Sequence, residues 1–508
     1  MAPTWICTFA LASAAAVAAQ CPDYAQYATA NHSPVSSGRY QLAFQRPTES
    51  CRTFTSPTVE QTITRLRNTI SDPDLARLFE NAFPNTLDTA IRWRGTAKGS
   101  DEELTFVITG DINAMWLRDS ANQMQSYMGL VNGSDDPLAG LVRGVINLQA
   151  RYIAASPFCN SFQPPVEAGL PLAGNGGANG DTVFPPYDPT VVFECKYELD
   201  SLAAFLQISA EYYSATGDAA FFGKYGWKRA VRAVLDTAYA MTNGTYAPDG
   251  KVLPSPYTWM RSTTRATETL ANDGVGNPVA AGTGLVRSAF RPSDDAAIYQ
   301  LFIPANMMFA RYLAAAADIA DKIREGGLSS EMKSFAASVR AAVLKAGVVE
   351  DKRFGKIYAY EVDGFGGVNI MDDANIPSLL AAPMMGFVER SDVVYQNTRK
   401  MILGAGNPYF MRGPVINAVG GPHNGPGLAW PMASIVRILT SDEEDEVRAV
   451  LKEIVASTDG LGLIHESVDS FNAGHWTRQW FSWANGLFGQ MILDLEKRMP
   501  GILKQSFQ

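Results

Sequence analysis

Apolar residues recur at helical spacing along most of the chain from Val59 onward. Ile63, Leu66 and Ile70 stand three and four residues apart, which places their side chains on one face of an α-helix. A second group of the same kind begins at Leu75. The same spacing predicts further helices over residues 115–130, 137–155, 196–216, 219–242, 294–323, 329–346, 372–385, 391–403, 427–439, 442–457 and 480–499.

Two segments near the start of this region have a different pattern. Residues 91–94 alternate apolar and charged side chains, and residues 103–108 are also strand-like. We therefore predict a small β element there. Long segments rich in Gly, Pro, Asn and aromatic residues separate some of the helices, and loops of such length in a compact domain usually serve a function. These segments are residues 156–194, 247–291 and 407–426.

The predicted elements indicate an all-α fold. Six helical hairpins closed into a ring, an (α/α)6 barrel or toroid, would present the long loops on one face, with the small β element beside them. A solenoid of helix pairs is the alternative, although the sequence shows no repeat of fixed period. We expect residues 59–508 to form a single domain, preceded by a polar extension over residues 20–58.

The first residues have the composition of a secretory signal peptide. Residues 4–19 form an Ala-rich apolar run that is short for a membrane span. Small residues at 16–18 suit a cleavage site. Because no Lys or Arg precedes the run, an uncleaved anchor or a mistaken start is the alternative to a signal peptide over residues 1–19. We expect a secreted protein, or one of the secretory pathway, with no other attachment to a membrane.

The cysteines and glycosylation sequons fit that compartment. Of the five cysteines, Cys7 would leave with the signal peptide, and four would remain. Four cysteines allow three connectivities. We favour Cys21–Cys51 and Cys159–Cys195 because each pair brackets a loop-like segment, the alternative being four buried thiols. The sequons are at Asn31, Asn132 and Asn243.

Charge and motifs exclude several classes of protein. The net charge is −9 and Lys and Arg are scattered, which argues against nucleic acid or an anionic membrane as a partner. The sequence has no P-loop, no Rossmann glycine pattern and no G-x-S-x-G elbow. Three of the four histidines, His423, His465 and His475, lie towards the C-terminus without a standard zinc spacing. We predict neither a metal nor a cofactor.

A distinctive polar cluster lies near the C-terminus. Residues 462–467 and 475–485 together hold one carboxylate, Glu466, with two of the four histidines and three of the nine tryptophans. Aromatic faces suit the apolar side of a sugar ring, and polar groups bind its hydroxyls. Hydrolysis of a glycosidic bond usually needs two carboxyl groups on opposite sides of that bond. Glu466 is therefore the first candidate for one of them.

The second carboxyl group could come from residues 290–296. Asp294 or Asp295 could act as a general acid if apolar neighbours kept its proton near neutral pH. Either could instead be a plain helix cap before an apolar helix. Glu361 and Asp363 are rival carboxyl groups, and Asp372 and Asp373 could cap the next helix. An acidic loop could also hold calcium, but this one lacks regular ligand spacing.

Residues 110–120 form another polar cluster, at a loop-to-helix junction. Trp116 could be a platform for a sugar ring, and the polar side chains around it could bind hydroxyls. The structural alternative is that Asp111 caps a helix while Arg118 and Asp119 form an ion pair.

Together these clusters resemble glycoside hydrolase family 125. The blocks that carry the resemblance are residues 109–120, 290–295, 371–375, 465–467 and 480–485, and it extends over about residues 60–498. The family comprises exo-acting α-1,6-mannosidases, with bacterial members and many fungal homologues. The resemblance implies an (α/α)6 barrel, an inverting mechanism without a metal, an Asp general acid and a Glu general base.

Carried onto this chain, the resemblance makes Glu466 the base and Asp294 the acid, with Asp295 as the second choice. The candidates for contact with the sugar are Asp111, Asn113, Trp116, Arg118, Asp119, Arg291, His465, Trp480 and Trp483. The motifs that carry the resemblance do not cover the extension or residues 156–194. The expected partner is a mannose-containing oligosaccharide, such as an N-glycan or mannan. The alternatives are another (α/α)6 glycosidase, such as an α-glucosidase, and a glycan-binding protein without catalysis.

Overall fold

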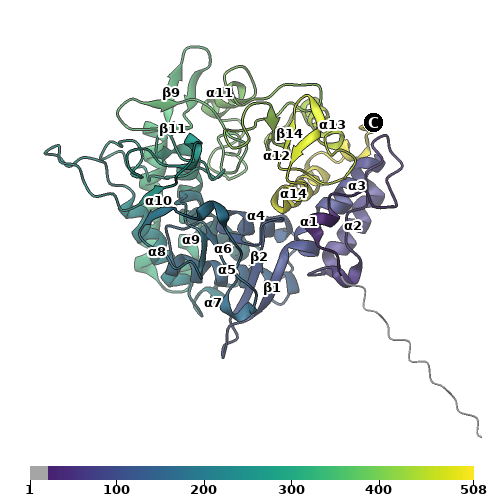
Figure 1. The fold of residues 1–508 in the computed structure, drawn as a ribbon, viewed down its shortest axis with the longest axis horizontal. Helices are drawn as coiled ribbons and strands as arrows, with labels where there is room; N and C mark the ends of the chain where they lie inside the picture. The colour runs from purple at the N-terminus through teal and green to yellow at the C-terminus, as the bar shows by residue number, and fades with distance from the viewer. Residues whose placement is uncertain (1–20) are drawn as a thin grey trace, which may run out of the picture.

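The computed structural model describes residues 21–508, whose helices are arranged in a ring (Figure 1). The predicted signal peptide lies outside these residues. The α-helices are α1 (Tyr24–Tyr27), α2 (Pro57–Thr69), α3 (Pro73–Ala82), α4 (Leu117–Met128), α5 (Pro137–Ala155), α6 (Leu199–Thr216), α7 (Ala219–Phe222), α8 (Trp227–Ala240), α9 (Ile303–Lys322), α10 (Gly326–Ala346), α11 (Val393–Ile402), α12 (Pro431–Leu439), α13 (Glu444–Ala456) and α14 (Ser482–Arg498).

Short strands lie in the segments between these helices. They are β1 (Ile91–Thr96), β2 (Glu103–Val107), β3 (Met115–Trp116), β4 (Ser161–Phe162), β5 (Thr182–Phe184), β6 (Val192–Glu194), β7 (Thr258–Met260), β8 (Leu301–Phe302), β9 (Val348–Asp351), β10 (Gly355–Tyr358), β11 (Glu361–Val362), β12 (Val368–Asn369), β13 (Leu428–Ala429), β14 (Ser467–Asp469) and β15 (Asn472–Thr477). The predicted β element is the antiparallel pair β1–β2. Two three-stranded sheets, β3-β4-β6 and β13-β14-β15, bear on the site described below.

The fold is an (α/α)6 barrel, as predicted. Helices α12, α14, α4, α6 and α9 contact one another in that order and form most of the inner ring. An outer layer covers them: α13 contacts α12, α3 contacts α14, α5 contacts α4 and α6, and α10 contacts α9. Most residues of the inner helices are buried, because these helices meet outer helices as well as the barrel centre.

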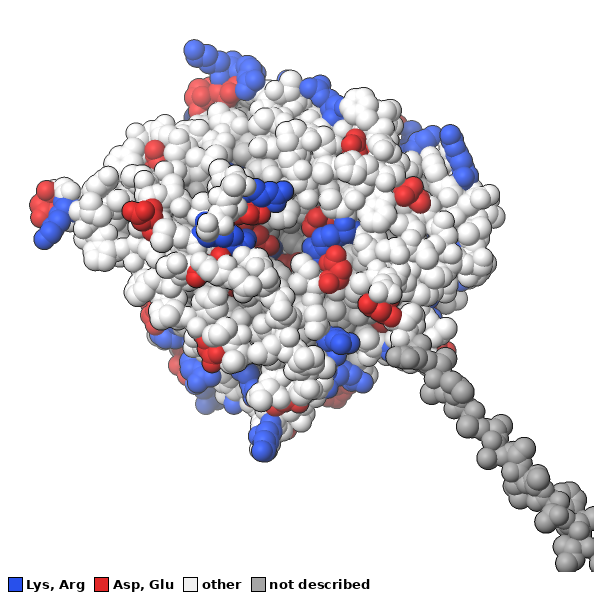
Figure 2. All heavy atoms as spheres, viewed as in Figure 1, with Lys and Arg blue, Asp and Glu red and all other residues white. Residues whose placement is uncertain are grey.

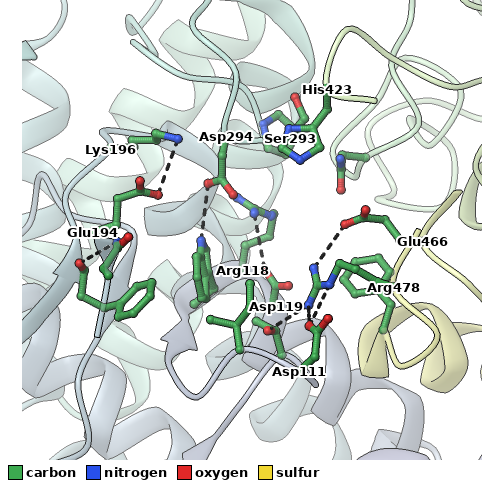
Figure 3. A pocket seen from close by; sticks show the side chains of 18 of the residues that line it. Asp111, Arg118, Asp119, Glu194, Lys196, Ser293, Asp294, His423, Glu466 and Arg478 are labelled. Atoms are coloured by element: carbon green, nitrogen blue, oxygen red, sulfur yellow. Dashed lines mark hydrogen bonds and ion pairs between the residues drawn. The ribbon is translucent and has the colours of Figure 1, made fainter. Parts of the chain in front are cut away.

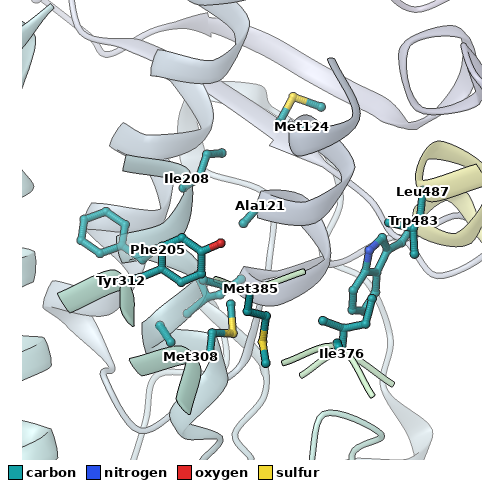
Figure 4. Close-up of a cluster of buried hydrophobic side chains, with 14 of the residues drawn as sticks. Ala121, Met124, Phe205, Ile208, Met308, Tyr312, Ile376, Met385, Trp483 and Leu487 are labelled. Carbon is teal, nitrogen blue, oxygen red and sulfur yellow. The ribbon is translucent and has the colours of Figure 1, made fainter. Parts of the chain in front are cut away.

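The remaining inner place is filled by residues 372–387, which do not form the predicted helix. Ile376 and Met385 of this segment belong to one buried cluster with side chains of α4, α6, α9 and α14 (Figure 4). The Asp372 carboxylate accepts the backbone N–H groups of Leu379 and Leu380, both at 2.9 Å. These groups would otherwise bond within a helix, so the segment keeps an irregular path while still burying its apolar side chains.

Two other predicted helices differ from the observed ones. The helix predicted to start at Asp294 starts at Ile303 instead, because Phe290 and Ala296 pair as an isolated bridge and close a tight loop between them. The helix predicted over residues 219–242 is divided into α7 and α8 by residues 223–226, which include two glycines.

Both predicted disulfides, Cys21–Cys51 and Cys159–Cys195, are present. The first holds the N-terminal extension, which rests against the segment before α14: the ring of Tyr24 meets that of Trp480 with centroids 4.8 Å apart. Within residues 21–508 no helix is long and apolar enough to cross a membrane.

Candidate active site

A cavity of about 690 Å³ opens where several inner helices begin. Trp116, Trp430 and Phe481, which immediately precede α4, α12 and α14, all line it. Acidic and basic side chains meet at this hollow (Figure 2). Residues 173–176 and Arg261, from two of the long loops, complete its rim.

The two long loops are joined to each other beside the cavity. Strands β5 and β7 pair across them, and the Arg261 guanidinium binds Asp181 at 2.7 Å and Glu194 at 2.8 Å. Planar guanidinium and carboxylate groups paired in this way hold a fixed geometry. The rim is therefore built from ordered loops, in keeping with the expectation that loops of this length serve a function.

Asp294 lies at the tip of the tight loop after Phe290. The backbone N–H of Asp294 donates to the carbonyl of Arg291 at 2.9 Å, and the N–H of Arg291 donates to the carbonyl of Asp295 at 2.8 Å. Asp294 adopts φ = +64°, a left-handed conformation that Asp tolerates better than most residues. The turn directs Asp294 into the cavity (Figure 3) and keeps the adjacent Asp295 out of its lining.

The Asp294 carboxyl group is held by donors from other loops. Asn160 Nδ2 donates to its Oδ1 at 2.9 Å, and Trp116 Nε1 lies 3.4 Å from the same atom. Asn160 is itself fixed, because its Oδ1 accepts the N–H of Lys196 at 3.0 Å. Since Asn160 and Lys196 each follow a half of the Cys159–Cys195 disulfide, that disulfide braces the surroundings of Asp294.

Asp294 has charged neighbours, whereas apolar neighbours were expected. Burial alone would raise the pKa of Asp294, but the nearby Lys196 ammonium and Arg118 guanidinium outweigh burial and hold the pKa below its usual value. Glu198 shows the opposite effect: burial, opposed by Arg118 and reinforced by Asp294, raises the pKa of Glu198 well above its usual value. The proton of this buried group of charges is therefore favoured on Glu198.

Glu466 lies on the opposite side of the cavity (Figure 3), just before β14. Thr477 Oγ1 donates to its Oε2 at 2.9 Å, and Arg478 Nη1 donates to its Oε1 at 3.2 Å. Arg478 Nε also donates to Asp111 Oδ1 at 2.8 Å. The strand pairing of β14 and β15 brings Thr477 opposite Ser467, the residue after Glu466, which explains how a side chain eleven residues away in sequence comes to hold the Glu466 carboxylate.

The predicted contact residues divide into two groups. Those that line the cavity are Asp111, Asn113, Trp116, Arg118 and Asp119. Those buried behind its walls are Arg291, His465, Trp480 and Trp483. Arg291 Nε donates to Glu361 at 2.6 Å, and the His465 ring stacks on Trp476 with centroids 4.4 Å apart. Residues of this second group can support the walls but do not face the cavity.

The rival carboxyl groups are also outside the cavity lining. Glu361 is buried against Arg291, and Asp363 Oδ1 accepts the N–H groups of Phe365 and Gly367 at 2.7 and 2.8 Å. Among residues 21–508, no group of three or more His, Cys, Asp and Glu side chains has a geometry that could hold a metal ion.

Several residues around the site were not among the predicted ones. Lys196, Glu198 and Asn160 surround Asp294, and His423 lines the cavity with its Nδ1 3.6 Å from Asp295 Oδ2. A signal for Glu198 was present, because it and Asp200 stand at the start of an otherwise apolar helix. That pattern is also typical of ordinary helix starts, so sequence alone did not distinguish it.

The (α/α)6 barrel and the two carboxyl groups, Asp294 and Glu466, that face each other across its cavity define the class of this protein: it is a glycoside hydrolase. A family model described as "Metal-independent alpha-mannosidase (GH125)" matches residues 72–493. The chain belongs to this family, and the resemblance noted from its motifs is confirmed.

Two known proteins show how far the similarity extends. The Meiotically up-regulated gene 157 protein of Schizosaccharomyces pombe is 48% identical over 488 residues, which cover 96% of this chain and 94% of that protein. A solved structure of a metal-independent α-mannosidase from Streptococcus pneumoniae, in a non-productive complex with α-1,6-mannobiose, has a TM-score of 0.77 at 31% identity. That match covers 87% of this chain and 99% of the bacterial one.

Proposed function

We propose that this α-mannosidase is exo-acting, removes terminal α-1,6-linked mannose from glycans or mannan, and inverts the anomeric configuration. The observation that carries the proposal is that Asp294 and Glu466 face each other across one cavity (Figure 3). The α-1,6 linkage is supported by the mannobiose bound in the Streptococcus pneumoniae relative. Exo action is supported by the ordered loops at the cavity rim, which suit the end of a chain better than its middle.

In this mechanism the two carboxyl groups divide the chemistry. Asp294 donates a proton to the departing glycosidic oxygen, while Glu466 takes a proton from the water that attacks the anomeric carbon on the opposite face. Inverting enzymes keep such groups about 6.5–9.5 Å apart to leave room for the water. Arg478 and Thr477, which bind the two oxygens of Glu466, orient its carboxylate toward that water.

Recognition of the terminal sugar is assigned to the residues that line the cavity. Asp111, Asn113, Arg118 and Asp119 supply acceptors and donors for hydroxyl groups, and Trp116 supplies an apolar face. Two buried polar atoms beside this cavity, Asn113 Oδ1 and Asp119 Oδ2, have no hydrogen-bond partner within the protein. Hydroxyl groups of a bound sugar would satisfy them.

We also propose that residues 1–19 direct the protein into the secretory pathway and are then cleaved from it. Two disulfides support this, because disulfides persist in oxidising compartments. The side chains of all three sequon asparagines, Asn31, Asn132 and Asn243, are exposed, as attachment of a glycan requires.

An NMR time course with α-1,6-mannobiose tests the proposed reaction. We expect β-mannose to appear first and to mutarotate later. Initial release of α-mannose would contradict inversion, and hydrolysis of α-1,2- or α-1,3-mannobiose in preference to the α-1,6 isomer would contradict the linkage. Absence of hydrolysis from every α-mannoside would favour a glycan-binding protein without catalysis.

A further inference from the structure

The carboxyl group proposed as the acid has an unexpected setting for that task. A general acid must hold its proton until the glycosidic bond breaks, yet Lys196 and Arg118 hold the pKa of Asp294 below its usual value. The site therefore needs a source of the proton other than an isolated Asp294. Buried ionisable groups beside Asp294 are where that source must be sought.

The buried charges on this side of the cavity do not balance. Arg118 forms ion pairs with Asp119 at 3.4 Å and with Asp200 at 3.2 Å, and also with Glu198. With Asp294 the cluster has four carboxyl groups, against the two cations Arg118 and Lys196. Lys196 also pairs with Glu194 at 3.5 Å. His423, the other cation near Asp294, lies 3.6 Å from Asp295, so neither Lys196 nor His423 neutralises this cluster alone. Burying unpaired negative charge is costly, so such a cluster retains protons on some of its carboxyl groups.

Glu198 is the carboxyl group in direct contact with Asp294. Its side chain is fully buried, its Oε1 accepts from Asn160 Nδ2 at 3.1 Å, and its Oε2 accepts from Ser201 Oγ at 2.8 Å. The same Asn160 Nδ2 donates to Asp294 Oδ1 at 2.9 Å. One amide nitrogen thus bridges the two carboxyl groups. Two buried carboxyl groups held this close together are stable only if one of them keeps a proton.

The geometry points to a shared proton: Glu198 is a positioning residue that carries the proton in the resting enzyme and supplies it to Asp294 during cleavage. This inference rests on the proposed function. As the C–O bond breaks, its electron pair stays on the leaving oxygen. The single proton moves from Glu198 to Asp294 and from Asp294 to that oxygen, so Asp294 ends the step as a carboxylate, as it began. Glu198 is left as a carboxylate beside Arg118 and Ser201. The attacking water gives its proton to Glu466, and exchange with solvent then restores both groups.

Glu198→Gln tests the inference with two substrates. α-1,6-Mannobiose needs a proton on its leaving oxygen, whereas fluoride leaves α-mannosyl fluoride without one. We expect the variant to lose roughly 10²-fold in kcat on mannobiose but to hydrolyse the fluoride within about threefold of wild type. The basic limb of its pH profile on mannobiose should also move to lower pH, because Asp294 then faces Lys196 and Arg118 without an acid beside it.

Asp200→Asn is the matched control. Asp200 is equally buried and also binds Arg118, and burial raises its pKa to about 6, but it does not share the Asn160 bridge. A purely structural effect of disturbing Arg118 should lower hydrolysis of both substrates by the same factor in either variant. If Glu198→Gln shows that equal loss, or keeps wild-type rates and pH limb, the inference is wrong.

Two other outcomes, an inactive wild type and a variant that does not fold, must be distinguished from failure of the inference. If wild type hydrolyses neither substrate, it is the proposed function that fails. If Glu198→Gln does not fold, isotope-edited infrared spectroscopy of wild type with labelled glutamate carboxyl groups provides the test. We expect a protonated glutamate band near neutral pH that shifts in Asp294→Asn, and its absence, or its insensitivity to that substitution, would overturn the inference.

Discussion

The two walls of the cavity hold chemically similar carboxyl groups in different ways. On one wall Asp294 lies among buried charges with more carboxyl groups than cations, next to Glu198, whose pKa burial raises. On the other wall Glu466 is bound by Arg478, whose side chain is 21% exposed, and by a threonine hydroxyl. An excess of buried carboxyl groups on the first wall favours retention of a proton there. This contrast agrees with the proposed roles of Asp294 as the acid and Glu466 as the base.

The largest expected effect comes from removing the base. Glu466→Gln should lose about 10²–10⁴-fold in kcat on α-1,6-mannobiose and on α-mannosyl fluoride alike, because the attacking water needs activation whatever the leaving group. Steady-state rates on both substrates measure this. A variant that lost activity on mannobiose alone would reverse the assignment of the two walls.

Removing the acid should affect only the substrate with the poorer leaving group. Asp294→Asn is expected to lose about 10²–10⁴-fold on mannobiose and less than about tenfold on the fluoride, since fluoride departs unaided. Asp295→Asn is the control, because Asp295 is adjacent in sequence and buried but does not line the cavity. It should keep the wild-type ratio of the two rates. If Asp295→Asn, rather than Asp294→Asn, lost activity on mannobiose but kept it on the fluoride, Asp295 would be the acid.

The two disulfides are expected to contribute similarly to stability but differently to catalysis, with effects smaller than those of the carboxyl substitutions. Replacing both cysteines of either bridge by Ala should lower the free energy of unfolding by about 2–5 kcal/mol, since the bridges close loops of similar length, with separations of 30 and 36 residues. Only loss of Cys159–Cys195 should also lower kcat on mannobiose, by several-fold, because that bridge braces Asn160 and Lys196. Chemical unfolding and kinetics well below the midpoint separate the two effects; an equal loss of kcat in both variants would contradict this role.

Much of the fold could be predicted because helical periodicity is a local signal. The pattern over residues 137–155 corresponds to α5, whose start is marked by Asp136 and Pro137. Residues 372–385 have apolar spacing of the same kind, yet the Asp372 carboxylate binds the backbone of Leu379 and Leu380 and replaces helical bonds. That competition depends on how the buried segment fits the ring, which no local pattern contains.

The sequence located the two candidate carboxyl groups of the site better than its walls. Motifs indicated Asp294 and Glu466, which both line the cavity, whereas composition alone could not separate aromatic residues that face the cavity from those behind it. Trp480 looked suited to a sugar, yet its ring meets Tyr24 of the extension and its Nε1 donates to Asn85 at 3.1 Å. Glu198 was missed for the converse reason, since its importance comes from burial and from an amide contributed by another loop.

Replacement of His423 is expected to have the smallest effect, a modest change in stability. His423 interacts with carboxyl groups of both walls. Burial alone would lower its pKa, but Asp295, Glu466 and Asp294 outweigh burial and raise the pKa to about 9, against about 6.5 for an unperturbed histidine. A raised pKa in the folded state means that the charged form stabilises the fold fully below pH ~6.5 and loses this effect as pH rises through about 9.

The stability difference between wild type and His423→Gln should therefore be greatest near pH ~6 and disappear near pH ~10. The side chain is 38% exposed, so solvent screens its charge and the difference should be modest. Urea unfolding of both proteins across this range measures it. A difference that did not change with pH would show that packing rather than charge is what His423 contributes. A difference that grew towards high pH would mean that its carboxyl neighbours on the two walls do not stabilise its protonated form.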